Sequence, residues 1–262
     1  MFKRTRLTQQ TILITGASSG MGRELAVQLA GQQNRLILIA RRQELLNELV
    51  ETLPSATEKH LIFQGDVAEH EDVKSICESL LRDNIHVDVL LLNAGRGGGF
   101  DVSDIDLESF HQQMDVNFWG MVYFVKYLVP GMIERRRGIL AMNGSLAGYR
   151  GVPNAAPYSA SKGALINFID SLRIDLYKYH IQCTLISPGF VKTPLTDLNE
   201  FYMPFMLSVE KAARIIIRGL EHGRAEIHFP WRLSLVAKLG RLMPAKWYAR
   251  MMQGSRIPKK EQ

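Results

Sequence analysis

Short apolar runs alternate with longer amphipathic stretches along most of the chain. The runs are rich in Ile, Leu and Val and predict strands at residues 11–14, 35–40, 60–63, 87–92, 138–142, 181–186 and 225–229. Stretches of helical composition lie between them, at residues 24–30, 44–53, 72–81, 109–135, 159–179 and 209–221. Strands that alternate with helices at this spacing indicate βαβ units and a mostly parallel sheet. Because the runs are nearly continuous, we expect the sheet to be covered on both faces.

No linker, repeat or low-complexity segment divides the 262 residues, so we predict one doubly wound α/β domain. Apolar residues make up 46% of the chain and charged residues 22%, which excludes a disordered protein. The pattern predicts neither a transmembrane helix nor a secretory signal, because no apolar run is long enough for either. Two cysteines, Cys77 and Cys183, are too few for a disulfide framework or a zinc site. Their number is compatible with a reducing, cytoplasmic setting.

The net charge of +6 is concentrated at the C-terminal end. Residues 223–262 carry nine Lys and Arg and two acids, a net charge of +7, while the other 222 residues sum to −1. Neither an aromatic-rich basic strand nor a zinc finger accompanies this charge, so the sequence does not predict nucleic-acid binding. His60, His111, His180 and His222 are not arranged as metal ligands, and we expect no metal site.

A glycine-rich segment, TGASSGMG at residues 15–22, follows the first predicted strand and opens a helix. Glycines let the backbone turn tightly and approach a bulky anion, and a helix N-terminus supplies free N–H donors. The spacing G-x-x-x-G-x-G differs from the general G-x-G-x-x-G dinucleotide motif. The segment predicts a phosphate-binding turn, although on its own it also fits an ordinary tight turn between strand and helix.

The second predicted strand is followed by Arg41 and Arg42 rather than by an acid. An acid there would hydrogen-bond the ribose 2′-hydroxyl of NAD, whereas two guanidinium groups suit a 2′-phosphate. This position therefore favours NADP over NAD. The alternative is that both arginines are solvated charges at the start of a helix.

Tyr158 and Lys162 stand four positions apart, on one face of a predicted helix. A phenol has a pKa of about 10. A nearby ammonium favours the phenolate, so we expect Lys162 to lower the pKa of Tyr158 toward working pH. Alone, this pair is weak support, but Ser145 follows the fifth strand, and ligands of open α/β sheets bind beyond strand ends. We expect four strand ends to face one crevice, carrying residues 16–22, 93–95, 145 and 188–189.

Together these motifs resemble those of the short-chain dehydrogenase/reductase family. The matching motifs are TGASSGMG, Asp66-Val67, NAG at 93–95, Asn117, Ser145, YSASK at 158–162, and Pro188-Gly189 with Thr193. They occur in the family's order and spacing over roughly residues 9–230. The resemblance implies a single Rossmann-type domain with strand order 3-2-1-4-5-6-7. Residues 1–230 would form its NADP-binding catalytic part and residues 231–262 a basic amphipathic helical extension.

The resemblance also implies the role of each residue. Tyr158 would protonate the carbonyl oxygen while hydride arrives from C4 of the nicotinamide, and Ser145 would hydrogen-bond that oxygen. Lys162 would lower the pKa of Tyr158 and bind the nicotinamide ribose, and Asn117 would hold a water in a proton relay. Asp66 and Val67 would meet the adenine and Thr193 the carboxamide. The NADP(H) contacts implied are Gly16, Ser18, Ser19, Gly20, Met21, Gly22, Arg41, Arg42, Asp66, Val67, Asn93, Ala94, Gly95, Tyr158, Lys162, Pro188, Gly189, Val191 and Thr193.

Three of these residues also have purely structural explanations. Asn117 would serve as a polar break in a buried helix, Asp66 as a helix N-cap, and Ser145 as an ordinary turn residue. The combination of Tyr158 and Lys162 with Ser145 is harder to explain by structure alone.

Two segments beside the expected crevice are open to more than one interpretation. Residues 96–99, Arg-Gly-Gly-Gly, predict either a mobile loop over the crevice or a plain connector. Residues 190–208 match the family's substrate lid and are rich in Phe, Tyr, Met and Leu. An apolar lid favours a lipophilic carbonyl or alcohol substrate. The alternative is that these side chains pack as an ordinary interior.

The C-terminal segment has a further possible role. Residues 231–252 mix apolar residues with regularly placed Arg and Lys, and we expect Pro244 to start a second short helix. A basic amphipathic helix with Trp and Tyr is suited to an anionic membrane surface, so peripheral membrane contact is one expectation. Packing on the body or on a partner subunit is the alternative. The family resemblance implies a homo-oligomer.

The sequence therefore predicts an NADP(H)-dependent oxidoreductase that interconverts a lipophilic ketone or aldehyde and an alcohol, with Ser145 and Tyr158 contacting the substrate. Two other functions stay open. One is a catalytically silent NADP-binding regulator on the same fold, and the other is a membrane-surface interaction protein whose tail is the functional part. A nucleotide-binding methyltransferase fits less well, because it has no use for Tyr158 and Lys162.

Overall fold

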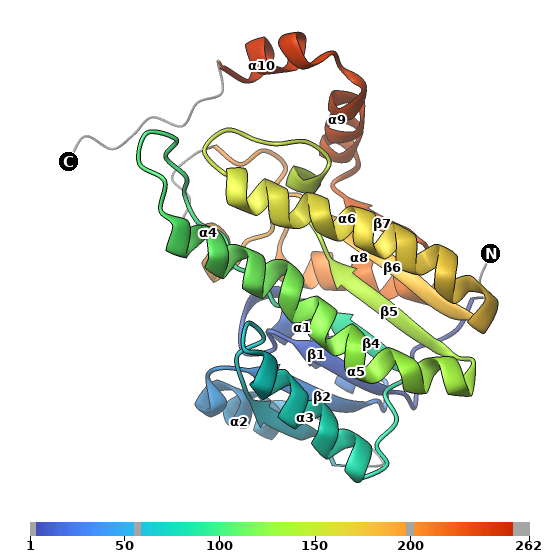
Figure 1. Cartoon of the computed structure of the whole chain (residues 1–262). Helices are drawn as coiled ribbons and strands as arrows, with labels where there is room; N and C mark the ends of the chain where they lie inside the picture. The colour runs from blue at the N-terminus through green and yellow to red at the C-terminus, as the bar shows by residue number, and fades with distance from the viewer. Residues whose placement is uncertain (1–3, 55–58, 198–201, 254–262) are drawn as a thin grey trace.

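The computed structural model describes residues 4–54, 59–197 and 202–253. One sheet runs through it, and its neighbouring strands are all parallel, in the order β3-β2-β1-β4-β5-β6-β7 (Figure 1). The predicted strand order and the Rossmann-type doubly wound fold are confirmed. The strands are β1 (Thr11–Thr15), β2 (Arg35–Ala40), β3 (Leu61–Gln64), β4 (Val89–Leu92), β5 (Gly138–Asn143), β6 (Ile181–Pro188) and β7 (Glu226–Phe229).

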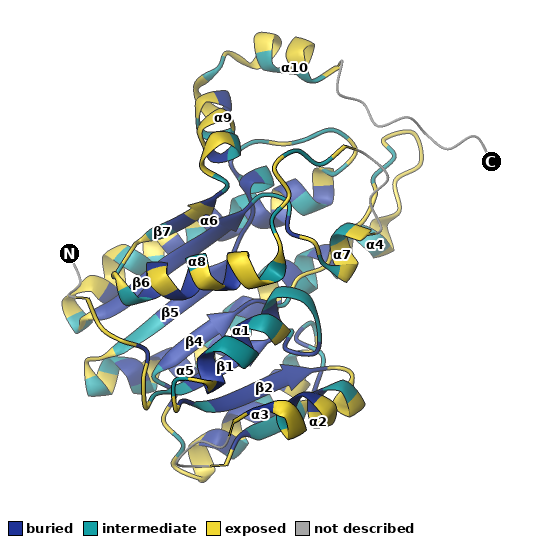
Figure 2. Cartoon of the chain, turned by 180° about the vertical axis from the view of Figure 1, so that it is seen from behind, coloured by how far each residue is buried: buried dark blue, intermediate teal, exposed yellow. Residues whose placement is uncertain are grey.

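Helices cover both faces of this sheet. The helices α3 (His70–Arg82), α5 (Gly120–Arg135) and α6 (Ala156–Leu176) pack on the face seen in Figure 1. The helices α1 (Gly20–Ala30), α2 (Gln43–Thr52) and α8 (Val209–Glu221) pack on the opposite face, seen in Figure 2. The other helical segments are α4 (Leu107–Met114), α7 (Pro194–Asp197), α9 (Trp231–Leu242), α10 (Ala245–Gln253) and the 3-10 turns η2 (Leu146–Gly148) and η3 (Tyr177–Tyr179).

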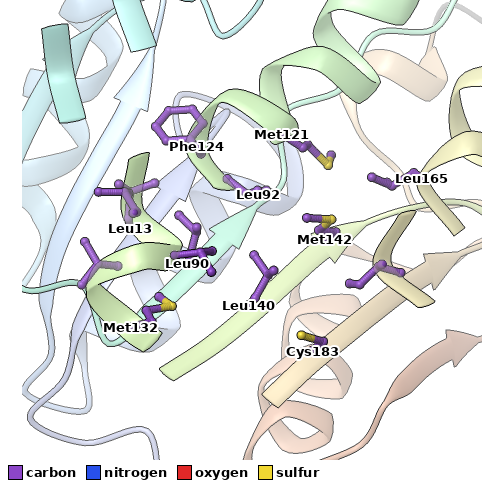
Figure 3. Close-up of a cluster of buried hydrophobic side chains, with 14 of the residues drawn as sticks. Leu13, Leu90, Leu92, Met121, Phe124, Met132, Leu140, Met142, Leu165 and Cys183 are labelled. Carbon is purple, nitrogen blue, oxygen red and sulfur yellow. The ribbon is translucent and has the colours of Figure 1, made fainter. Parts of the chain in front are cut away.

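Two clusters of apolar side chains, one on each face of the sheet, hold the layers together. Side chains alternate along a strand, so Leu13 points into the cluster under α5 (Figure 3) and Ile14 into the cluster under α1. Both are fully buried, which explains why β1 reads as one continuous apolar run. Each such side chain stabilises the fold by roughly 1.5–3 kcal/mol on transfer from water.

The long helix predicted at residues 109–135 is present, since residues 107–135 are helical throughout, but its hydrogen-bonding pattern changes within it. A π-helical turn, η1 (Asp115–Trp119), lies between α4 and α5. Gly120 follows it, packed so closely on Val67 that a Cβ would lie 2.6 Å from the Val67 carbonyl oxygen. The extra residue of a π turn lets the helix keep this contact while it turns Asn117 inward, and such turns are frequent at functional sites.

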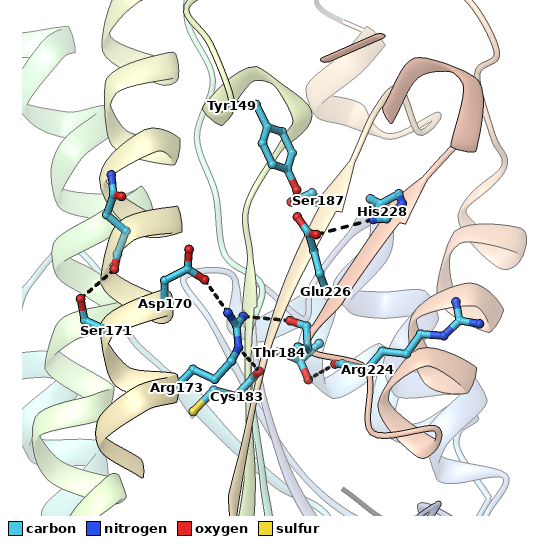
Figure 4. A network of polar contacts seen from close by, with 12 residues as sticks. Tyr149, Asp170, Ser171, Arg173, Cys183, Thr184, Ser187, Arg224, Glu226 and His228 are labelled. Carbon is cyan, nitrogen blue, oxygen red and sulfur yellow. Dashed lines mark hydrogen bonds and ion pairs between the residues drawn. The ribbon is translucent and has the colours of Figure 1, made fainter. Parts of the chain in front are cut away.

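Polar contacts fasten the edge strand β7 to the body (Figure 4). The Arg173 guanidinium of α6 donates to the carbonyl oxygens of Cys183 (3.2 Å) and Ala225 (2.9 Å). The Thr184 hydroxyl donates to the carbonyl oxygen of Arg224 at 2.8 Å. The Ala225 carbonyl oxygen also accepts the Leu185 N–H at 3.0 Å, so these bonds tie the residues just before β7 to α6 and β6.

The C-terminal helices are attached through Arg150. Its guanidinium donates to the carbonyl oxygens of Gly240 and Met243, which end α9, and lies 4.1 Å from the centre of the Tyr248 ring in α10. The Tyr248 hydroxyl donates to the Gly151 carbonyl oxygen at 2.8 Å. α9 ends at Leu242 and α10 begins at Ala245, so the expected second helix near Pro244 is confirmed. Within the described residues, the structure has no helix with the length and hydropathy of a membrane span.

Replacing Arg150 by Ala is expected to loosen α9 and α10 while the sheet stays intact. A charged donor that satisfies two helix-end carbonyls is worth about 1.5–3 kcal/mol. The free energy of local opening of the α9 and α10 amides, measured by native-state hydrogen exchange, should fall by roughly that amount. Arg82→Ala, which changes an exposed residue of α3, is the matched control and should change nothing there. Unchanged protection in Arg150→Ala would refute the anchoring role.

Candidate active site

The glycine-rich segment and the NAG motif meet at the ends of β1 and β4. The Thr15 hydroxyl accepts hydrogen bonds from the backbone N–H groups of Asn93 and Ala94, both at 3.0 Å. The Asn93 amide donates to the Thr15 carbonyl oxygen at 3.1 Å. Gly16 has a φ of +67°, and a Cβ on it would lie 2.9 Å from the Ala94 Cα atom. Only glycine fits this left-handed position against the neighbouring loop.

Gly22 closes the turn onto α1. A Cβ at this position would lie 2.2 Å from the carbonyl oxygen of Gly16. Helix α1 begins at Gly20, and the first N–H groups of a helix, here at Gly20, Met21 and Gly22, have no acceptor within it. This end of α1 therefore offers donors and partial positive charge to an anion, in a cradle that extra side chains would fill. A dinucleotide phosphate fits it.

The end of β6 adjoins the same turn. A Cβ on Gly20 would lie 3.2 Å from the Thr193 methyl group. Pro188 ends β6, and the Gly189 N–H donates to the carbonyl oxygen of Phe229 at 2.7 Å. Val191 is buried. The structure thus brings the predicted residues after β1, β4 and β6 to one edge of the sheet.

Arg41 and Arg42 make different contacts. Arg42 donates to the hydroxyls of Ser18 and Ser19, each at 3.0 Å, so its guanidinium lies beside the glycine-rich segment. Arg41 is exposed and pairs with the Asp66 carboxylate at 3.5 Å. Arg42 is exposed and is the N-cap residue of α2, so the alternative of a solvated charge at the start of a helix stays open beside its contacts with the two serine hydroxyls.

Asp66 is not a helix N-cap, so the structural role that the sequence offered as an alternative for this residue is wrong. Helix α3 begins at His70, and its N-cap is Glu69. The Asp66 carboxylate instead accepts the Ala68 N–H at 3.0 Å in a local turn. This turn leads Val67, which is buried, past the ends of the strands.

Ser145, Tyr158 and Lys162 come together beyond the end of β5. Ser145 is buried, and its hydroxyl hydrogen-bonds the Tyr158 phenol. Its oxygen also accepts the Ala147 N–H at 3.1 Å, so the turn role suggested for it is present as well. Lys162 is 2% exposed, and its Nζ donates to the Asn143 carbonyl oxygen at 2.7 Å. The Lys162 Nζ lies 5.8 Å from the centre of the Tyr158 ring.

The prediction that Lys162 lowers the pKa of Tyr158 is wrong. Burial raises the pKa of the Tyr158 phenol, and the hydrogen bond with Ser145 opposes this only in part. Burial also lowers the pKa of Lys162 to about 7, so a large share of this amine is neutral near pH 7. A neutral amine does not stabilise a phenolate by its charge, which is why the sequence-based argument from spacing alone fails.

Asn117 is fully buried in the π turn, with its amide held on both sides. Its Oδ1 accepts the Arg96 N–H at 2.8 Å, and its Nδ2 donates to the Arg96 carbonyl oxygen at 2.8 Å and to the Ser161 hydroxyl at 3.1 Å. A Cβ on Gly95 would lie 3.4 Å from the Asn117 Oδ1 and 3.7 Å from the Lys162 Nζ. Asn117 is therefore more than a polar break, because it fixes the NAG loop beside Lys162. Its role in a proton relay stays a prediction.

The roles of two site residues escaped sequence reasoning, although Thr15 belongs to the glycine-rich motif. Thr15 organises the contact between two loops through its hydroxyl, and Asn143 supplies the carbonyl that receives Lys162. Asn143 also donates from its side chain to the Asn93 Oδ1 at 3.2 Å. Both stand at strand ends that the pattern located, but nothing in the pattern distinguishes them from other polar residues there.

The lid segment is exposed over much of its described length. Tyr202, Phe205 and Met206 are exposed, so the alternative of an ordinary interior is wrong for them, while Phe201 lies outside the described residues. A Cβ on Gly97 would lie 3.3 Å from the Leu195 side chain in α7, which places the glycine loop next to the lid. Mobility of the glycine loop stays a prediction.

Other reactive groups do not add to this site. In the described parts of the chain, no three His, Cys, Asp or Glu residues are grouped to hold a metal. His60 is a satisfied core residue that accepts the Leu36 N–H at 3.1 Å. Burial raises the thiol pKa of both Cys77 and Cys183 to about 12, so neither is a nucleophile at neutral pH.

Comparisons with known proteins agree with this geometry. The family model described as short chain dehydrogenase matches residues 10–201. An uncharacterized oxidoreductase of Myxococcus xanthus is 35% identical over 238 residues, which cover 91% of this chain and 94% of that protein. An 11-beta-hydroxysteroid dehydrogenase of Pinus massoniana is 31% identical over 240 residues, covering 84% of this chain and 67% of that protein.

A solved structure is similar over most of the chain. The crystal structure of a variant of actinorhodin polyketide ketoreductase with NADPH has a TM-score of 0.77 and 26% identity, covering 88% of this chain and 99% of that one. The similarity to these proteins, in both sequence and fold, thus extends over the glycine cradle, the strand ends and the residues around Tyr158. The chain belongs to the short-chain dehydrogenase family of oxidoreductases.

Proposed function

We propose that the protein is an NADP(H)-dependent oxidoreductase that interconverts a lipophilic carbonyl compound and an alcohol, with Tyr158 as the general acid and base. The observation that carries the proposal is the meeting of Ser145, Tyr158 and Lys162 beyond β5, next to the glycine cradle. A partly buried tyrosine beside a buried serine and a buried lysine, at the end of a parallel sheet, suits proton transfer to and from a substrate oxygen.

Arg42 supports NADP over NAD. Its guanidinium and the hydroxyls of Ser18 and Ser19 form a compact group of donors at the end of β2, where a ribose 2′-phosphate would lie. Arg41 is engaged by Asp66 and would contribute less. The similar ketoreductase was crystallised with NADPH, and this accords with the choice.

The bound nicotinamide would supply or accept the hydride, and the chain would manage the proton. Because burial raises the pKa of Tyr158, its phenol stays protonated at neutral pH and is ready to donate to the carbonyl oxygen. Ser145 would hydrogen-bond the same oxygen. Burial lowers the pKa of Lys162 to about 7, so this amine would be able to hold or release a proton near neutral pH.

The lid supports a lipophilic substrate. Leu195, Tyr202, Phe205 and Met206 stay exposed, and apolar side chains around a crevice favour an apolar ligand. The relative from Pinus massoniana carries the name of a hydroxysteroid dehydrogenase, which fits the same class of compound. A panel of rigid apolar ketones is therefore the first choice when substrates are tested.

Tyr158→Phe is expected to lower kcat by at least about 100-fold in NADPH oxidation by a responsive ketone, because it removes the proton donor. NADPH affinity, measured by nicotinamide fluorescence, should stay within about twofold. Tyr149→Phe is the matched control, since Tyr149 is a buried tyrosine whose hydroxyl donates a hydrogen bond to the Ser187 hydroxyl at 3.4 Å. Normal turnover in Tyr158→Phe would refute the assignment. Tight NADPH binding with no oxidation by any carbonyl would favour the silent regulator instead.

Arg42→Ala is expected to weaken NADPH binding by about tenfold or more, because a charged hydrogen-bond donor to a phosphate is lost. NADH binding should change by less than about twofold, since NADH has no 2′-phosphate. Arg41→Ala serves as the matched control and should have a smaller effect. Equal weakening of both cofactors by Arg42→Ala would remove the argument for NADP.

Lys162→Met tests the lowered pKa of the buried Lys162 amine through the pH dependence of the free energy of unfolding. Burial lowers the pKa of Lys162 from 10.5 to about 7, so below pH 7 the folded protein carries an unfavourable buried charge. That penalty fades as pH rises from about 7 toward 10.5, because the folded state then holds the amine neutral. The free energy of unfolding of Lys162→Met relative to the parent should therefore fall by at least about 1 kcal/mol between pH 6 and pH 9, in urea titrations. Lys211→Met, at an exposed site, should show no such trend. A pH-independent difference for Lys162→Met would contradict the lowered pKa.

A further inference from the structure

Helix α9 packs with mainly small residues inward and with most of its large apolar residues outward. Ser234 and Gly240 are buried against the body, and Ala237 is partly buried with them. The opposite side of the helix carries Trp231, Leu235, Leu239 and Leu242, which are 68%, 52%, 56% and 81% exposed. Their spacing of four, four and three residues places them on one continuous stripe. An ordinary surface helix has the reverse arrangement.

This orientation is fixed by specific contacts. The Leu233 side chain fills the space beside Gly189, where a Cβ would lie 2.8 Å from it. The Ser234 hydroxyl donates to the Pro230 carbonyl oxygen at 2.8 Å, and Arg150 holds the other end of the helix. Small residues on the inner side allow this close approach. The packing of the inner side of α9 therefore determines that the apolar stripe faces outward.

Helix α10, which follows α9, also carries exposed apolar side chains. Trp247 and Met251 of α10 are exposed, and the Arg232 guanidinium lies 5.4 Å from the Trp231 ring and 5.8 Å from the Phe205 ring of the lid. Figure 2 shows α9 and α10 standing out from one end of the body with mostly exposed residues. We name this surface the α9–α10 face and define it as Trp231, Leu235, Leu239, Leu242, Trp247 and Met251.

The charge of this surface has one sign. No Asp or Glu occurs between residues 227 and 260. The described cations there are Arg232, Lys238, Arg241, Lys246 and Arg250, of which Lys238 pairs with Glu226. A second copy docked by a two-fold axis would bring these cations against one another. A surface of anionic lipid headgroups would instead supply opposite charge around a zone that accepts apolar side chains.

We propose that the α9–α10 face docks on an anionic lipid bilayer, with its tryptophans and leucines in the headgroup region and its cations among the lipid phosphates. The helices then lie along the membrane surface, and the lid containing Phe205 faces the lipid. The docking is independent of the proposed reaction, because it rests on the exposure and charge of these helices.

The test is flotation of the full-length protein with vesicles of phosphatidylcholine alone or mixed three to one with phosphatidylglycerol. The expected result is binding to the mixed vesicles, at least about tenfold stronger than to phosphatidylcholine and weakened by salt. Leu235→Glu with Leu239→Glu should reduce this binding by at least about tenfold. The matched control is Ile174→Glu with Leu81→Glu, which changes two apolar residues of α6 and α3 that are 78% and 49% exposed and should bind as the parent does.

Lys246→Glu with Arg250→Glu separates charge from apolar contact and should abolish the preference for phosphatidylglycerol. Circular dichroism checks that each variant is folded, which the exposure of every substituted residue favours. Absence of binding to mixed vesicles, or equal binding by Leu235→Glu with Leu239→Glu and the parent, would overturn the proposal. A smaller oligomer of that double variant in size-exclusion chromatography, together with no vesicle binding by the parent, would also overturn it and assign the face to a second copy.

Discussion

The Lys162 amine is withdrawn from water and donates at 2.7 Å to the backbone carbonyl of Asn143. Removing such a group from water is costly unless its donors are used, so this contact constrains the elements around it. It requires the last carbonyl of β5 to point toward α6. Ser145 follows that carbonyl by two residues, and Tyr158 lies one helical turn before Lys162, so both are positioned by the same requirement. The relative placement of the three reacting groups thus depends on one buried polar contact.

A second buried polar group extends this constraint to the neighbouring loops. Asn117 binds both backbone groups of Arg96, while Gly95 passes close to both Asn117 and Lys162. Thr15 in turn holds the backbone of Asn93 and Ala94. Hydrogen bonds with fixed directions, rather than apolar contacts, therefore set the shape of the loops that border the glycine cradle. The apolar clusters hold the layers together, and these few polar side chains position the loops.

The strands and their order could be predicted because each central strand is buried on both faces and leaves a continuous apolar run. The π turn could not, because it arises from contacts of Asn117 and Gly120 with segments distant in the sequence. The direction of the Tyr158 pKa was wrong for a related reason, since spacing reveals a nearby lysine but not its burial. Sequence likewise identified two arginines after β2, yet only the fold distinguishes Arg42, held by serines, from Arg41, held by Asp66. The pattern showed that α9 is amphipathic, and only the packing revealed which side faces outward.

Cys77 and Cys183 are both buried, with thiol pKa values raised to about 12, and they are the only cysteines in the sequence. Thiol-directed reagents attack the thiolate, which is almost absent at these two positions in the folded protein at neutral pH. The two natural cysteines of the folded chain are thus expected to react little with thiol-directed labels. A single cysteine introduced at an exposed site would carry a spin label or fluorophore alone, without removal of either natural cysteine from the core.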